Sequence, residues 1–284
     1  MKRNLFFCLL LLILFSGCSS GTRKQSDKIN IVCTIFPQYD WVREIIGEGN
    51  ENFELTLLMD GLDLHSYSPS VRDVAAISSA DVFIYVGGGS DGWVEAVLAQ
   101  TVNEEIIAVN LMEILGIKSN HEHGETCEED HGQDEHIWLS LRNARVICAA
   151  LAEIFSEIDP DNSQKYLSNL EMYTAELHAL EFQYQSVVSE ANIETLVFAD
   201  RFPFRHLADD CGLEYYAAFT GCSAETQAGF STIISLADRI NQLGLSAVMV
   251  TESSDQSFAR TVINNTACQS QKILVLDSMQ SVTL

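Results

Sequence analysis

Short apolar runs alternate along the chain with longer amphipathic stretches, and they do so in two separate sets. Runs of this length rich in β-branched residues predict strands, and stretches with apolar residues three and four apart predict helices. The first set has predicted strands at Ile29–Phe36, Phe53–Leu58, Val82–Val86 and Ile106–Val109, with predicted helices at Val71–Ser79, Trp93–Val102 and Asn143–Ile158. The second has predicted strands at Leu196–Ala199, Tyr215–Phe219, Ala247–Thr251 and Ile273–Leu276, with a predicted helix at Thr226–Leu243. Such alternation predicts two α/β units, each a parallel sheet covered by helices.

One long amphipathic segment separates the two sets. Asp159-Pro160 is a typical helix start, with a capping carboxylate and a proline in the first turn. Apolar residues then recur at steps of four and three, from Tyr166 to Val187. A helix over Asp161–Glu190 has thirty residues, or roughly 45 Å of length. Its stripe needs a partner. Packing against both lobes is favoured over a coiled-coil dimer, because the repeat stops with this one helix.

These patterns predict an α/β fold of two parallel-sheet lobes joined by one long helix, with a ligand site in the cleft between the lobes. The expected divisions are an N-terminal lobe over 29–159, the linking helix over 160–190 and a C-terminal lobe over 191–284.

The N-terminal segment has the layout of a secretory signal. Lys2 and Arg3 precede an apolar run over Leu5–Phe15, which is short for a membrane-spanning helix. Ser16-Gly17-Cys18 resembles the bacterial lipobox, in which the cysteine is acylated. The expectation is a signal over 1–18, a polar tether over 19–28 and a lipid-anchored exported protein; an ordinary signal with an incidental cysteine is the alternative.

Composition narrows the class of partner. Forty acidic residues against sixteen basic ones give a formal net charge of −24, which argues against nucleic-acid binding and is compatible with attracting cations. Six cysteines follow the predicted signal without forming a CxxC pair, so a cysteine-only zinc site is not expected. Disulfides and buried free thiols are both open for Cys33, Cys127, Cys148, Cys211, Cys222 and Cys268.

Four of the seven histidines fall within sixteen residues of one another. His121, His123 and His131 lie in a segment over 119–135 that has no apolar periodicity and is dense in imidazoles and carboxylates. Those groups bind zinc and similar ions, so the segment is predicted to be an auxiliary metal-binding loop. The alternative is a solvated acidic loop whose histidines are incidental.

Two further histidines stand beside predicted elements. His65 lies in a polar turn after the Phe53–Leu58 strand, and His136 lies just before an amphipathic helix. A lone histidine in either setting is more often a surface or capping residue, but two in comparable positions beside a histidine-rich loop are candidate ligands.

The segments around these two histidines resemble motifs of a known family. His65-Ser66-Tyr67-Ser68-Pro69 and Asp134-Glu135-His136-Ile137-Trp138 are similar to the two histidine motifs of zinc- and manganese-binding solute-binding lipoproteins of ABC transporters. Asp159-Pro160 and Leu274-Val275-Leu276-Asp277 are similar to the entry of that family's long helix and to its last strand. The resemblance runs from about Ile29 to the C-terminus and implies His65, His136 and Asp277 as metal ligands.

The remaining ligand position of the family is occupied by an unsuitable residue. Counting back from Gly212-Leu213 places Arg201 there, and arginine stays protonated and cannot coordinate a metal. Asp200, at the end of a predicted strand, is the favoured replacement. His206, or a three-ligand site completed by water or a loop histidine, is the alternative.

The resemblance implies capture of Zn²⁺ and its delivery to a membrane permease, by a monomer that is not an enzyme. Two imidazoles with one or two carboxylates also suit Mn²⁺ or Fe²⁺, and the histidine-rich loop favours zinc. Because imidazole must be neutral to bind, affinity should fall below about pH 6.5. An exported zinc hydrolase and a non-metal solute or adhesion lipoprotein are competing hypotheses; no HExxH motif supports the former.

Overall fold

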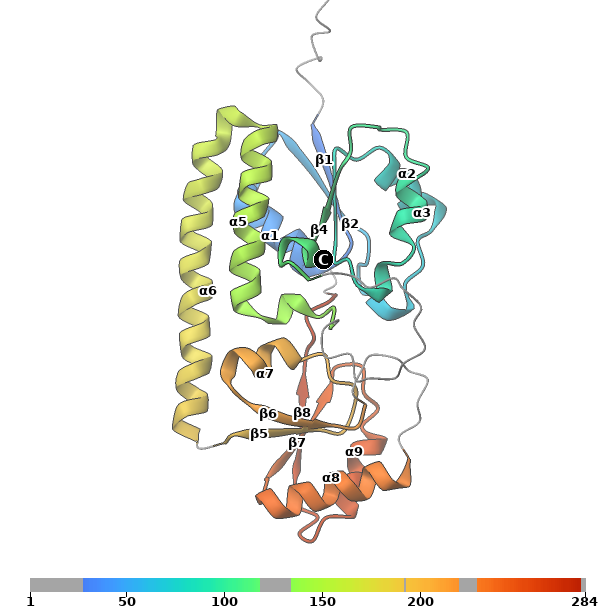
Figure 1. Cartoon of the computed structure of the whole chain (residues 1–284), viewed down its shortest axis with the longest axis vertical. Coiled ribbons are helices and arrows are strands. Elements are labelled where there is room, and N and C mark those ends of the chain that lie inside the picture. Colours follow the sequence, from blue (N-terminus) through green and yellow to red (C-terminus); the bar gives the residue numbers. More distant parts are fainter. Residues whose placement is uncertain (1–27, 118–133, 192, 220–228, 282–284) are drawn as a thin grey trace, which may run out of the picture.

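The chain forms two α/β lobes stacked end to end, with one long helix beside them (Figure 1). This computed structural model describes residues 28–117, 134–191, 193–219 and 229–281. Cys18, the signal, the tether before residue 28 and the loop histidines His121, His123 and His131 therefore lie outside the described residues. No helix within the described ranges has the length and apolarity to cross a membrane.

The first lobe is built on a four-stranded parallel sheet in the order β2-β1-β3-β4. Its strands are β1 (Ile29–Cys33), β2 (Phe53–Leu57), β3 (Val82–Tyr85) and β4 (Ile107–Asn110). Its helices are α1 (Phe36–Ile46), α2 (Val71–Ser78), α3 (Val94–Leu98), α4 (Leu111–Ile114) and α5 (Leu141–Ile158). Figure 1 shows α1 and α5 on one side of this sheet and α2 and α3 on the other.

The first predicted strand was too long. It ends at Cys33, and α1 begins at Phe36 with Pro37 in its first turn. The apolar run continues from the strand into the helix, and a short apolar run does not distinguish the two by periodicity. The predicted helix over Trp93–Val102 was also too long, since α3 ends at Leu98.

The second lobe repeats the arrangement with the parallel order β6-β5-β7-β8. Its strands are β5 (Thr195–Phe198), β6 (Glu214–Ala217), β7 (Ala247–Thr251) and β8 (Lys272–Leu276). Its helices are α7 (Arg205–Cys211), α8 (Phe230–Leu243) and α9 (Ser257–Asn264). The predicted two-lobed fold with parallel sheets is thus confirmed.

The linking helix α6 (Ser163–Ala191) runs beside both lobes (Figure 1). Tyr166 anchors its start: the ring is buried against Phe53 and Phe155, and the hydroxyl donates to Asp159 Oδ2 at 2.6 Å. The Asp159 carboxylate therefore holds a side chain of the first turns. It does not cap a backbone N–H, so the predicted capping role was wrong.

Only part of the predicted stripe on α6 is covered. Leu177 is buried, whereas Tyr184 is 44% and Val187 is 64% exposed. The helix packs mainly on α5 and α1 of the first lobe, so its final turns extend past most of that contact. The prediction that the whole stripe packs against both lobes was wrong for these turns.

The strand order places a switch point in each sheet. β1 and β3 are neighbours in the first lobe, and β5 and β7 are neighbours in the second. Chain connections diverge to opposite sides at such a point, which opens a crevice at the carboxyl ends of the two strands. Residues that follow these strands are therefore positioned to line a site.

The segment after β8 returns to the first lobe. The Trp138 indole donates to the carbonyl of Ser278 at 2.7 Å, and Gln280 Oε1 accepts from the backbone of Leu64 at 3.2 Å. These bonds join the lobes beside the cleft. The described cysteines Cys33, Cys148, Cys211 and Cys268 are free thiols.

Candidate metal centre

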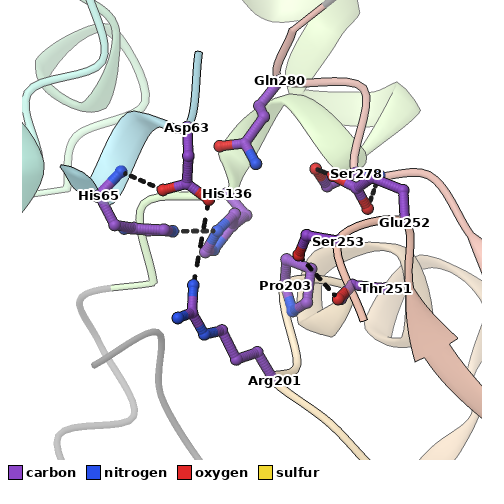
Figure 2. Close-up of a pocket in the computed structure, with 10 residues that line it drawn as sticks. All are labelled: Asp63, His65, His136, Arg201, Pro203, Thr251, Glu252, Ser253, Ser278 and Gln280. Atoms are coloured by element: carbon purple, nitrogen blue, oxygen red, sulfur yellow. Dashed lines mark hydrogen bonds and ion pairs between the residues drawn. The ribbon is translucent and has the colours of Figure 1, made fainter. Parts of the chain in front are cut away.

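A small pocket lies between the lobes, where the carboxyl ends of the two sheets meet (Figure 2). It has a volume of about 20 Å³, roughly what one water-sized particle needs. The described residues that line it come from both lobes and are mostly polar. They are Asp63, His65, His136, Arg201, Pro203, Thr251, Glu252, Ser253, Ser278 and Gln280.

His65 reaches the pocket from a single turn of 3₁₀ helix (Leu64–Ser66) after β2. Asp63 caps that turn, because its Oδ1 accepts the backbone N–H of His65 at 2.9 Å. Nδ1 of His65 lies 3.0 Å from Ser90 Oγ and 3.0 Å from Glu135 Oε1. The ring is thus held from behind and presents Nε2 to the pocket.

His136 reaches the pocket from the start of the segment that leads into α5. A 3₁₀ turn (Ile137–Leu139) follows it, and Ser140 then caps α5 by accepting from the N–H of Asn143. The His136 side chain is 2% exposed, and its Nδ1 lies 2.7 Å from Asp134 Oδ1. This ring is also fixed by a carboxylate on the side away from the pocket.

Both supporting carboxylates are ionised at neutral pH. Burial acts to raise the pKa of Asp134, but its hydrogen bonds to His136 outweigh burial and leave the pKa below its usual value. Burial also acts to raise the pKa of Glu135, but its hydrogen bonds with His65 and Ser90 leave that pKa below its usual value. An ionised carboxylate can only accept, so Nδ1 of each histidine donates to its carboxylate and Nε2 is turned toward the pocket.

The two Nε2 atoms face one another. Nε2 of His65 lies 3.2 Å from Nε2 of His136, although the residues are 71 positions apart in the chain. Two acceptors at this distance repel unless a proton or a cation lies between them. Nitrogens bound at about 2.0–2.1 Å to one tetrahedral zinc are about 3.3–3.4 Å apart. The pair therefore has the spacing that two zinc ligands need.

Glu135 reaches His65 because of a glycine. A Cβ on Gly88 would lie 2.4 Å from both the Cβ and Oε2 of Glu135. The Gly87-Gly88-Gly89 run lies just after β3. It provides the close approach that lets Glu135 bond the N–H and hydroxyl of Ser90, at 2.9 and 2.6 Å.

The two predicted carboxylate ligands do not line this pocket. Asp200 Oδ2 accepts from the N–H and hydroxyl of Thr251, at 3.1 and 2.8 Å, and its Oδ1 accepts from the N–H of Arg201. Asp277 Oδ1 accepts from Met279 at 2.8 Å, and Asp277 lines a separate, largely apolar cavity beside α6. Within the described residues, no three His, Cys, Asp or Glu side chains are grouped to hold a metal.

His206 and Arg201 occupy different surroundings. Nε2 of His206 bonds the backbone carbonyl of Asp134 at 2.9 Å, so it supports the first lobe's ligand segment from outside the pocket. Arg201 points into the pocket, toward Asp63 and the two histidines (Figure 2).

Glu252 is a second-lobe carboxylate that lines the pocket. Its two oxygens accept from the hydroxyl and the N–H of Ser278, at 2.6 and 3.1 Å. It directly follows β7, one of the two switch-point strands, as Arg201 closely follows the other. Asp277 follows the edge strand β8 instead. The strand order therefore distinguishes Glu252, which lines the pocket, from Asp277, which does not.

A buried acid behind the site makes stability depend on pH. Asp91 is 5% exposed, its Oδ2 accepts from Gly87 at 2.9 Å, and its Oδ1 has no hydrogen-bond partner among the described residues. Burial, reinforced by the charge of Glu135, raises its pKa from 3.8 to about 6. The folded state therefore binds this proton more tightly than the unfolded chain, and the carboxyl's contribution to stability is lost as pH rises through about 4 to 6.

Asp91→Asn should remove that pH dependence. We expect urea unfolding of wild type to lose on the order of 1–3 kcal/mol from this group between pH 4 and 7, and the variant to lose much less. Exposed Asp161→Asn is the matched control and should follow wild type. Equal slopes for wild type and Asp91→Asn would contradict the assignment.

Comparisons with known proteins agree on one family. The family described as "ZnuA: Zinc-uptake complex component A periplasmic" matches residues 31–283. The chain is 26% identical over 290 residues to the zinc-binding lipoprotein AdcA of Streptococcus pneumoniae serotype 4, covering 99% of this chain and 56% of that protein. It is 22% identical to the high-affinity zinc uptake system protein ZnuA of Bacillus subtilis, covering 97% of this chain and 89% of that protein.

Solved structures share the fold. The Zn(II)-bound ZnuA-like domain of Streptococcus pneumoniae AdcA has a TM-score of 0.69 and 24% identity, over 90% of each chain. The chain spans about half the length of the first curated relatives it matches. With the match covering nearly all of its residues, the chain belongs to the family of the zinc-uptake complex component A, ZnuA.

Proposed function

We propose that this protein captures Zn²⁺ between its two lobes and delivers it to the permease of an ABC transporter for import. The observation that carries the proposal is the facing pair of Nε2 atoms on His65 and His136, 3.2 Å apart. Each imidazole turns its Nδ1 toward a carboxylate, so both Nε2 atoms face the pocket.

His65 and His136 are the proposed ligands from the first lobe, and a carboxylate completes the set. The predicted ligands Asp277 and Asp200 rank behind the carboxylates that already line the pocket. Asp200 would have to give up its bonds from Thr251, and Asp277 would have to leave the cavity beside α6. His121, His123 and His131 remain predicted auxiliary ligands that collect ions weakly.

The relatives' names support the choice of zinc over Mn²⁺ or Fe²⁺, since AdcA and ZnuA are described as zinc-binding and zinc-uptake proteins. The name of ZnuA, an uptake system protein, also supports import. The name of AdcA, a lipoprotein, supports anchoring through Cys18. We propose that the protein is a monomer and that it binds the ion without catalysing a reaction. A zinc hydrolase would need a general base beside a metal-bound water. The glutamate of the pocket, Glu252, is poorly placed for that role because both of its oxygens accept hydrogen bonds from Ser278.

Deletion of residues 121–131 tests whether the pocket alone provides the tight site. The deletion removes three histidines but keeps Asp134, which positions His136. We expect calorimetry to show about one tightly bound zinc in both wild type and the deletion variant, with weaker additional binding lost in the variant. Loss of the tight zinc on deletion would place the main site in the loop, and no tight zinc in wild type would contradict the proposed function.

A further inference from the structure

Arg201 and Asp63 face each other across the pocket from different lobes (Figure 2). Nη1 of Arg201 lies 4.0 Å from Oδ2 of Asp63, and the two side chains are 34% and 33% exposed. An ion pair this long and this exposed contributes little to stability. The contact is therefore too weak to serve as a clamp between the lobes.

The two oxygens of Asp63 differ in their surroundings. Oδ1 accepts the N–H of His65 and so fixes the carboxylate beside the histidine pair. Oδ2 points toward Arg201, its ion-pair partner among the described residues. Glu252, the other carboxylate of the pocket, has each oxygen bonded to Ser278. Asp63 Oδ2 is thus the pocket carboxylate oxygen that can change partner at least cost.

Arg201 is a cation placed beside a site for a cation. It is the one lysine or arginine among the described residues that line the pocket. Its guanidinium stays charged and cannot coordinate a metal. A positive charge a few ångströms from Zn²⁺ is unfavourable, and both cations are attracted to the same carboxylate.

The free space of the pocket suits a single ion. The pocket's volume of about 20 Å³ holds about one water-sized particle. An ion that binds Oδ2 of Asp63 takes the place of the guanidinium there. Arg201 can withdraw, because its side chain is long, flexible and partly exposed.

We propose that Arg201 competes with zinc for Asp63: the guanidinium pairs with Asp63 when no ion is held, and zinc separates the pair and takes Oδ2 of Asp63 as its third protein ligand. This inference rests on the proposed function and adds to it a means of tuning release. A tethered cation that re-pairs with Asp63 as the ion leaves weakens binding and helps transfer to the permease.

Substitution of Arg201 tests the competition. Arg201→Met removes the charge and keeps an unbranched side chain, and we expect it to bind zinc about tenfold more tightly than wild type in competition calorimetry. Arg201→Lys keeps the charge and should stay within about twofold of wild type. Arg205→Met is the matched control: it removes the same charge from a residue that pairs with Asp209 outside the pocket, and its affinity should not change.

Substitution of Asp63 tests the assigned ligand. Asp63→Asn should weaken zinc binding by about ten- to a hundredfold, and the gain from Arg201→Met should shrink in that background because the contested carboxylate is gone. A larger loss in Asp277→Asn than in Asp63→Asn would overturn the assignment. Thermal unfolding of each variant without zinc controls for loss of the Asp63 cap.

Other outcomes overturn the competition itself. Weaker binding in Arg201→Met, with wild-type affinity rising on addition of bicarbonate, would show that Arg201 holds an anion beside the metal. Unchanged affinity in Arg201→Met would show that Arg201 has no part in binding. If the histidine pair is still required in either case, this inference fails and the proposed function stands.

Discussion

Replacement of both His65 and His136 by alanine is expected to lower zinc affinity by on the order of a thousandfold or more. A tight zinc site derives on the order of ten kcal/mol or more from its ligands, and each 1.4 kcal/mol is about tenfold in affinity. The two imidazoles are the proposed nitrogen ligands of the pocket, and their Nε2 atoms lie 3.2 Å apart. No other described side chain can take over this geometry.

Competition calorimetry with a chelator measures the affinity, and thermal unfolding gives a second readout. Zinc binds the folded state, so it should raise the Tm of wild type by mass action and leave that of the double variant nearly unchanged. His178→Ala is the control, since this exposed histidine lies on α6 away from the pocket. Wild-type affinity in the double variant would show that the assigned site is wrong.

Glu135→Gln is expected to weaken zinc binding by about ten- to a hundredfold without touching the metal. The carboxylate lies 3.0 Å from Nδ1 of His65 and accepts two bonds from Ser90. An amide in its place can donate to Nδ1, which moves the imidazole proton to Nε2 and blocks the lone pair that faces the pocket. Affinity falls because the free protein then holds the wrong tautomer.

NMR of the imidazole nitrogens tests this cause directly. Wild type should have Nδ1–H at His65, and Glu135→Gln should show a population with Nε2–H. Exposed Glu95→Gln on α3 removes the same charge from the first lobe and serves as the control. An affinity within twofold of wild type for Glu135→Gln would mean that Ser90 alone orients His65.

Much of the fold could be predicted because it depends on local patterns. The eight predicted strands correspond to β1 through β8, since β-branched runs and their flanking turns act over a few residues. The boundaries were less accurate where an apolar run passes from strand to helix, as between Cys33 and Phe36. The sequence also could not show how much of the apolar stripe on α6 is buried, because a stripe does not specify how far the neighbouring helices extend along it.

The candidate site was predicted in its first lobe and not in its second. His65 and His136 are marked by motifs around them, and both reach the pocket. Asp200 and Asp277 satisfied the rule that ligands follow strand ends, but so do Arg201 and Glu252. The order of the strands separates Glu252 from Asp277, because β7 is at the switch point whereas β8 is at the edge. Asp200 follows the switch-point strand β5, but its carboxylate is bonded to Thr251.

The sequence by itself determined that this chain is a two-lobed α/β protein of a metal-binding family, and it identified two histidines as candidate ligands. Periodicity and short motifs are local, and they persist whatever surrounds them. Only the tertiary structure decided that the two imidazoles meet Nε2 to Nε2, that Asp134 and Glu135 fix their protons, and that Arg201 faces Asp63 across the pocket. Those relations join residues from distant parts of the chain, so packing and not pattern sets their distances.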